Sequence, residues 1–242
     1  MSMDLMEAEE MLATAKRFPN LVTMVCPPPF GLKGDLLVKK LLAENYLGTP
    51  HHIRLQSFME AYVDPEAPAH WRQRVELSGL NVLALGIYVE VLQRWFGNIT
   101  GVYARGKILN PIRQGYEVII PDMLNVLCTF EGGAEAVLEF SGVNALSTGD
   151  RLEVYGDTGT MTYDFGNDVV QAGKIGDRAL HTVEITKELE GGWQVEDDFI
   201  AAVKSKGKLR PRPDFEEGFR YMRVVQAVAD SRAANEWVPI KS

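Results

Sequence analysis

Apolar residues near the start of the chain recur at helical spacing. In residues 3–18 they form one stripe, and Asp4 and Glu7 have the three-residue spacing of a capping box. The stripe consists of Leu5, Ala8, Met11, Leu12 and Ala15. The apolar run at 21–26 predicts a buried strand that ends at a proline cluster, and residues 33–46 predict a second helix that ends at Gly48.

Residues 123–141 alternate more clearly, because two apolar runs flank Gly132 and Gly133. Two glycines between strands predict a hairpin with a tight turn. Pairing across a two-residue turn puts Leu127, Ala136, Leu138 and Phe140 on one face, and Leu124, Val126, Cys128, Phe130 and Val137 on the other, with Glu135 and Glu139 among them. Both faces are then largely apolar, unlike those of a half-solvated antiparallel sheet. We therefore expect helices to pack on one face of the sheet and a different element, such as a second subunit, to pack on the opposite face.

The remaining pattern adds strands and then helices. Strands are expected at 51–59 and 99–109, in a second hairpin at 151–165, and at 169–174 and 179–185; helices are expected at 78–97, 193–206 and 214–237. Asp214 and Glu217 form a second capping box before the last helix. This order predicts an α+β fold with a large, mostly antiparallel open sheet and helices packed on one face.

Composition narrows the function without naming it. The net charge of −8 disfavours a nucleic-acid partner, because phosphate binding needs a basic surface. Two cysteines provide neither a disulfide framework nor a zinc site, which suits a cytoplasmic protein. No apolar run approaches the ~20 residues of a membrane span. We therefore expect neither a nucleic-acid nor a membrane partner.

Several common catalytic and cofactor motifs are missing. The 22 glycines include no GxG pair, so the sequence has neither the dinucleotide fingerprint nor a phosphate-binding loop. No GxSxG or HExxH motif occurs. His51 and His52 are adjacent in a predicted strand and point to opposite faces, so they cannot share a metal. The sequence therefore predicts no metal site and no cofactor site of its own.

The strongly apolar helix predicted at 78–97 contains one candidate catalytic residue, Tyr88. Asn81, Ala84 and Tyr88 are spaced by three and four residues, which places them on one helical face. A phenol on that face is able to act as a proton donor over a pocket. The alternative is a core tyrosine whose hydroxyl finds a backbone carbonyl, and the residues alone favour this alternative because buried tyrosines are common.

The stretch from 70 to 97 resembles the central motif of the glucose–fructose oxidoreductase, inositol dehydrogenase and rhizopine-catabolism (Gfo/Idh/MocA) family. Trp71, Arg72, Ser78, Gly79 and Gly86 match the motif in register. Residues 3–18, 41–55 and 152–165 resemble three further family segments in the same order, so the resemblance covers essentially the whole chain.

The resemblance implies the family's C-terminal domain. Residues 1–30 look like the last helix and strand of a dinucleotide-binding domain, and 31–242 look like the substrate and oligomerisation domain. The family's catalytic lysine would precede Met1. Ala84 replaces the motif aspartate, and Tyr88 replaces the motif histidine. The resemblance thus favours Tyr88 as the catalytic acid.

The resemblance also implies a function. We expect the substrate-binding and oligomerisation domain of an NAD(P)-dependent oxidoreductase that acts on a sugar, polyol or related alcohol, with Asn81, Trp71 and Arg72 lining the pocket. No cofactor is expected in this chain, whereas NAD or NADP is implied for a full-length parent, so the chain is expected to be inactive alone. The alternatives are a non-catalytic scaffold, either homo-oligomeric through the open sheet face or paired with a paralogue, and a piece of a longer protein.

Overall fold

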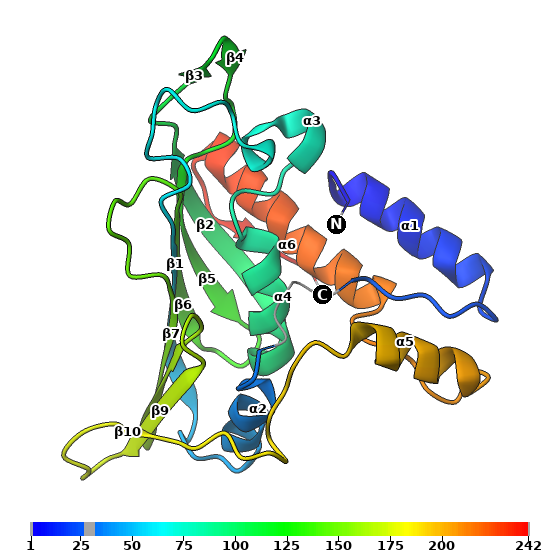
Figure 1. Cartoon of the computed structure of the whole chain (residues 1–242), viewed down its shortest axis with the longest axis vertical. Helices are drawn as coiled ribbons and strands as arrows, with labels where there is room; N and C mark the ends of the chain where they lie inside the picture. Colours follow the sequence, from blue (N-terminus) through cyan, green and yellow to red (C-terminus); the bar gives the residue numbers. More distant parts are fainter. Residues whose placement is uncertain (1, 27–31, 242) are drawn as a thin grey trace.

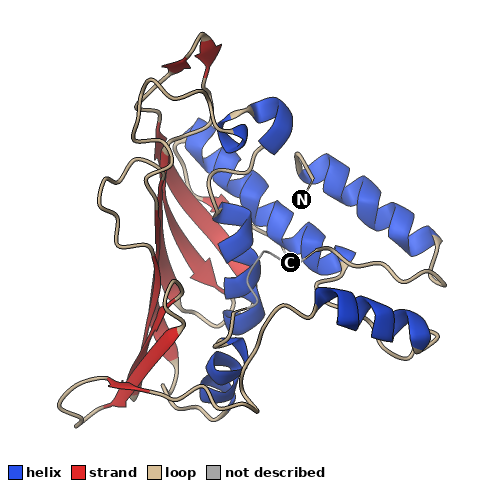
Figure 2. Ribbon diagram, in the orientation of Figure 1, coloured by secondary structure: helices blue, strands red, loops and turns tan. Residues whose placement is uncertain are grey.

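The computed structural model describes residues 2–26 and 32–241 as one sheet with helices on one side (Figures 1 and 2). The helices are α1 (Leu5–Arg17), α2 (Asp35–Ala43), α3 (Val75–Ser78), α4 (Leu85–Phe96), α5 (Val195–Lys204) and α6 (Phe215–Ala234), with the 3-10 turn η1 (Trp71–Gln73). The large sheet contains β1 (Pro50–Phe58), β2 (Ile99–Lys107), β5 (Met123–Phe130), β6 (Glu135–Ser141), β7 (Asp150–Gly156), β8 (Gly159–Asp164), β9 (Val169–Lys174), β10 (His181–Thr182) and β11 (Val238–Pro239). A separate small hairpin joins β3 (Ile112–Arg113) to β4 (Tyr116–Glu117).

The nine-stranded sheet has the order β10-β9-β8-β7-β1-β6-β5-β2-β11. Within it, β1 pairs with β6 in parallel, and the other described neighbours are antiparallel. The predicted α+β fold with a mostly antiparallel open sheet is therefore confirmed. No helix in the described part of the chain combines the length and hydrophobicity needed to cross a lipid bilayer.

The core lies between the sheet and the helices α4 and α6. Nine of the twelve residues of α4 are buried, and α6 crosses the sheet near β2. Ser231 on α6 links the two layers, because its hydroxyl accepts a hydrogen bond of 2.9 Å from the backbone N–H of Ala104 on β2. The predicted capping box of α6 is present, with Asp214 and Glu217 each accepting from the other's backbone N–H at 2.9 Å.

The hairpin of β5 and β6 is confirmed, but its predicted register is wrong. Phe130 accepts a hydrogen bond from the N–H of Gly133, and Leu127 pairs with Val137 rather than lying on the face of Leu138. The turn holds three residues, with Gly133 at a φ of 85°. One additional turn residue moves the pairing by one position, which reverses every predicted face of one strand relative to the other.

The corrected register gives the hairpin one apolar face and one mixed face. The side chains on the helix side are at most 2% exposed; they are Leu124, Val126, Cys128, Phe130, Ala136, Leu138 and Phe140. The opposite face carries Asn125, Thr129, Glu135 and Glu139 around the pair of Leu127 and Val137. The expectation of two largely apolar faces was therefore wrong. No helix of the described residues lies over that outer face (Figure 1).

Two further elements differ from the sequence-based expectation. Residues 21–26 form no strand, since the segment runs past the turn before α6 and Val25 N–H donates to Pro213 O at 2.9 Å. A strand needs a neighbouring strand for its backbone groups, and the sheet offers none there. The helix predicted at 78–97 begins only at Leu85, because Leu83 adopts a left-handed φ of 52°. Such a residue ends helical geometry.

Candidate functional site

Trp71 and Arg72 lie at the start of η1, on the outside of the molecule. Trp71 is 50% exposed, and the Arg72 guanidinium carbon lies 4.3 Å from the centre of the Trp71 ring. His70 orients the pair, because its Nδ1 accepts the Arg72 N–H at 3.1 Å. The stacked guanidinium and indole form an exposed planar surface with hydrogen-bond donors at its edge. Such a surface can pack against one face of a ligand and donate hydrogen bonds to its polar groups.

Asn81 lies in the loop between α3 and α4, next to the start of the chain. It is 5% exposed, and its Nδ2 donates to Ser78 O at 3.3 Å and to Ser2 O at 3.4 Å. Within the described residues, Asn81 Oδ1 and Ser2 Oγ are buried without a hydrogen-bond partner. An amide oxygen and a hydroxyl without partners, on two residues that contact each other, mark a place where a water or a ligand hydroxyl would be stabilised.

Gly79 explains why the start of the chain can come so close. Its φ is 58°, and an added Cβ would lie 2.0 Å from Met3 O. The neighbouring Leu80 N–H donates to the same Met3 oxygen at 2.8 Å. Only glycine adopts this conformation at low cost and leaves room for the approaching backbone. The motif glycine therefore joins residues 2 and 3 to the loop that carries Asn81.

The loop break separates residues that the sequence placed on one helical face. Ala84 is the N-cap of α4 and Tyr88 lies one turn into the helix, where its N–H donates to Ala84 O at 3.1 Å. Asn81 precedes the left-handed Leu83 and so is not on the α4 face. The predicted stacking of Asn81, Ala84 and Tyr88 is wrong for Asn81.

Tyr88 points from α4 into the core. It is 0% exposed, and its ring centre lies 5.4 Å from that of Phe165 and 6.2 Å from that of Phe140. Its hydroxyl donates a hydrogen bond to Asp150 Oδ2 on β7. The sequence missed Asp150, because an acidic residue directly after Gly149 at the start of a strand looks like part of a turn. Its helix-facing position depends on a pairing that cannot be read locally.

The environment of this pair keeps the phenol proton of Tyr88 in place. Burial, followed by the nearby Asp150 charge, raises the pKa of Tyr88 far above its usual value. Burial also raises the pKa of Asp150, although the hydrogen bond from Tyr88 opposes that shift. At neutral pH Tyr88 therefore remains a neutral donor held in a fixed direction. This arrangement can orient a phenol, and it is also a satisfied polar pair in a core.

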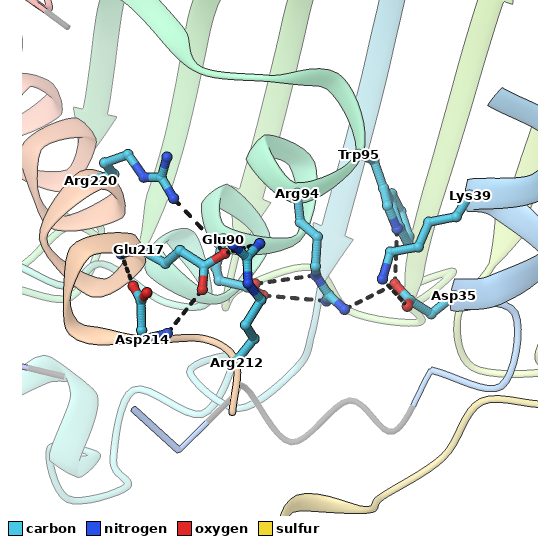
Figure 3. A network of polar contacts seen from close by, with 9 residues as sticks. All are labelled: Asp35, Lys39, Glu90, Arg94, Trp95, Arg212, Asp214, Glu217 and Arg220. Carbon is cyan, nitrogen blue, oxygen red and sulfur yellow. Dashed lines mark hydrogen bonds and ion pairs between the residues drawn. The ribbon is translucent and has the colours of Figure 1, made fainter. Parts of the chain in front are cut away.

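A separate polar cavity of about 430 Å³ opens between α2, α4 and the start of α6. Figure 3 shows its ionic network: Asp35 accepts from Lys39 at 2.7 Å and from Arg94 at 3.0 Å, and Arg94 also contacts Glu90 at 3.2 Å. Arg212 completes the network through Glu217 at 3.1 Å. Burial raises the pKa of Glu90, while Arg94 lowers it. Because these charges are already paired, the network primarily ties the helices together.

The described residues do not fit a dinucleotide. The sequence has no GxG pair, and the parallel strands β1 and β6 are each followed by a loop rather than by a helix whose N-terminus could hold a pyrophosphate. No group of three or more potential metal ligands occurs among the described His, Cys, Asp and Glu side chains.

Comparison with known proteins identifies the family. The sequence model of the GFO/IDH/MocA C-terminal domain matches residues 36–162. A search of curated protein sequences finds no match. Among solved structures, an oxidoreductase domain protein from Kribbella flavida is 23% identical with a TM-score of 0.90, and the alignment covers 100% of this chain and 72% of that chain.

Two further structures agree. An NAD-binding oxidoreductase from Klebsiella pneumoniae is 24% identical with a TM-score of 0.84, covering 100% of this chain and 72% of that chain. A levoglucosan dehydrogenase in complex with NADH is 20% identical with a TM-score of 0.87, covering 100% of this chain and 71% of that chain. At these identities the likeness shows the fold. Since the family model matches more than half of the residues, the chain belongs to the GFO/IDH/MocA family through its C-terminal domain.

Proposed function

We propose that this chain provides the substrate-binding and oligomerisation part of an NAD(P)-dependent oxidoreductase that acts on a sugar, polyol or related alcohol. The observation that carries the proposal is the family match across residues 36–162, which includes Trp71, Arg72, Asn81 and Tyr88. The likeness to a levoglucosan dehydrogenase that binds NADH and levoglucosan supports a sugar-like substrate and, for a full-length parent, NAD or NADP.

The proposed roles follow from where the side chains lie. Tyr88 holds a proton on its hydroxyl oxygen, and Asp150 orients that hydroxyl. The orphaned Asn81 oxygen accepts a substrate hydroxyl, and the Trp71–Arg72 stack offers a flat polar surface. Tyr88 is fully buried, so proton transfer requires that substrate reach it beside the first turn of α4. No cofactor step is assigned to this chain, and we expect it to be inactive alone.

Ligand-observed NMR on the purified 242-residue chain tests the proposal. Saturation transfer to levoglucosan or L-sorbose is expected with the native chain and should be lost in Trp71→Ala. Trp237→Ala is the matched control, since the two indoles are 50% and 47% exposed. NADH and NADPH should remain unconsumed with every sugar. Equal transfer in both variants, or turnover of NADH by the chain alone, would contradict the proposal.

A non-catalytic scaffold is the second candidate, and the surface of the helical layer favours it. Met11 and Phe18 near α1 are 45% and 54% exposed, and Ile200 and Val203 on α5 are 47% and 51% exposed. Apolar side chains gathered on α1 and α5 suit a partner protein, such as a paralogue. Native mass spectrometry of this chain mixed with a full-length family member tests this candidate. Formation of heterodimers, together with an absence of sugar binding, would favour it.

A further inference from the structure

A pocket of about 480 Å³ lies at the edge of the sheet, and its lining includes none of the candidate site residues Trp71, Asn81 and Tyr88. It is formed by residues 104–106 of β2 and by residues 229–235 at the end of α6. The neighbouring strand β11 pairs with β2 at Val102 and Gly101, and no described strand continues this pairing along the second half of β2. Because β2 is four places from β7 in the sheet order, strand spacing puts this pocket roughly 19 Å from Asp150.

Arg232 provides the first unusual feature of this pocket. Its half-buried side chain has no carboxylate within ion-pair distance among the described residues. Burial lowers its pKa. The guanidinium lies over Gly106, where an added Cβ would come within 2.9 Å of Arg232 Nε. The glycine thus makes room for a partly desolvated cation that has no counter-ion among the described residues.

Arg105 and Asn235 complete a set of donors. Arg105 Nη1 donates to Asn235 Oδ1 at 2.9 Å, and the Tyr103 hydroxyl donates to the same oxygen at 3.0 Å. Because a guanidinium can only donate, these contacts fix the amide orientation and leave its Nδ2 without a described partner. Asn235 is itself held in place as the left-handed cap of α6, with a φ of 58°.

The pocket differs in charge from the rest of the chain. The chain has 33 acidic and 25 basic residues, so carboxylates are in excess. Yet the described lining of the pocket contains two arginines and an asparagine and no acidic side chain. A partly buried guanidinium needs an anion or full hydration to offset its desolvation. Two guanidinium groups and an amide that line the same pocket are donors of the kind that match the oxygens of a carboxylate or phosphate.

We propose that Arg105, Arg232 and Asn235 form a binding site for a small oxyanion, either a carboxylate or a phosphate monoester. Arg232 supplies the desolvated positive charge from the helix side of β2, and Arg105 supplies donors from the outer side. Asn235 holds Arg105 in place and offers its amide N–H groups. The site is independent of the sugar-binding function proposed above, because it shares none of its residues.

Titration of the full chain with inorganic phosphate, and separately with acetate, tests this proposal. Arginine Nε–H NMR signals report the binding: the Arg232 signal should shift and saturate with at least one of the two anions. Arg232→Gln and Arg105→Gln should each weaken the binding by about tenfold or more, because each removes a charge-assisted contact. A titration with sodium chloride at the same ionic strength is the control for a non-specific effect of salt on the NMR signals.

Arg223→Gln is the matched control, since Arg223 lies on the same helix, is partly buried and contacts the Phe219 ring at 5.9 Å instead of this pocket. It should leave the binding unchanged. Saturation by phosphate alone identifies a phosphate site, and saturation by acetate alone identifies a carboxylate site. The proposal fails if neither anion shifts the Arg232 signal, if chloride reproduces the shift, or if all three variants lose affinity equally. Circular dichroism confirms that each variant is folded.

Discussion

The hydroxyl of Tyr88 on α4 donates a hydrogen bond to the carboxylate of Asp150 on β7, 62 residues further along the chain. This contact connects the helical layer to the sheet at a position where Tyr88 is fully buried and Asp150 is partly buried. The contact gives Tyr88 a defined partner. Mutation of either partner can therefore test how much the hydrogen bond contributes to the stability of the fold.

Removing the hydroxyl should leave the carboxylate without its donor. Tyr88→Phe is expected to lower the free energy of unfolding by about 1–3 kcal/mol, the typical cost of a buried polar group that loses its partner. Asp150→Asn keeps an oxygen acceptor and removes the buried charge, so it should cost less than about 1 kcal/mol. Urea unfolding followed by circular dichroism measures both; a larger loss for Asp150→Asn would contradict this account.

The same pair should make stability depend on pH. Burial raises the pKa of folded Asp150 above its ordinary value of 3.8, so the folded state takes up a proton more readily than the unfolded chain. The stabilising contribution is therefore complete below about pH 4 and is lost as pH rises through the folded pKa. The free energy of unfolding of the native chain, relative to Asp150→Asn, should increase as pH falls from 7 to 4. A constant difference would argue against a raised pKa.

Gly79 should be intolerant of any side chain. Gly79→Ala combines a positive φ of 58° with a Cβ placed 2.0 Å from Met3 O, so the start of the chain must move. We expect a loss of about 2 kcal/mol or more and faster proteolysis near α1. Gly115→Ala is the control: its φ is also positive, at 82°, but nothing lies within 4 Å of the added Cβ. It should cost only about 1 kcal/mol and leave the cleavage pattern unchanged.

The open sheet face is our proposed homo-oligomer interface. Leu127 is 48% exposed at the centre of that face, and the ion pair of Arg54 with Glu139 lies on neighbouring strands. Leu127→Glu should convert the native oligomer to monomers in light scattering, because it buries a charge in the interface. Leu146→Glu, at a residue 91% exposed in a loop, should leave the oligomer intact. A native chain that is monomeric at micromolar concentration would exclude the interface.

Local pattern was sufficient for most elements of this fold. Asp4 and Asp214 are the N-caps of α1 and α6, as the spacing of polar residues predicted. The reciprocal capping box forms at Asp214, whereas the Glu7 carboxylate accepts from Met3 N–H instead of from Asp4 N–H. Alternation of apolar residues located β1, β5, β6 and the second hairpin. These features depend on neighbours a few residues apart, and so they are visible in a single sequence.

The candidate site was only partly predictable. The contact between Trp71 and Arg72 follows from their adjacency in the chain, and a family motif singles out Tyr88. Nothing in the sequence near residue 150 indicated that Asp150 would accept a hydrogen bond from Tyr88. Likewise, the contact of Asn81 with Ser2 joins residues 79 positions apart. Such contacts depend on which strands and loops become neighbours after folding.

The sequence by itself determined the periodicity, the helix caps and the balance of charge, because each of these is a property of short segments. Tertiary structure decided the register of the β5–β6 hairpin, the break at Leu83 and the partner of the Tyr88 hydroxyl. A single additional residue in the turn at Gly133 reverses the relative faces of two strands, and the energy that selects it comes from burying one whole face against α4 and α6. That energy belongs to the assembled layers rather than to any one segment.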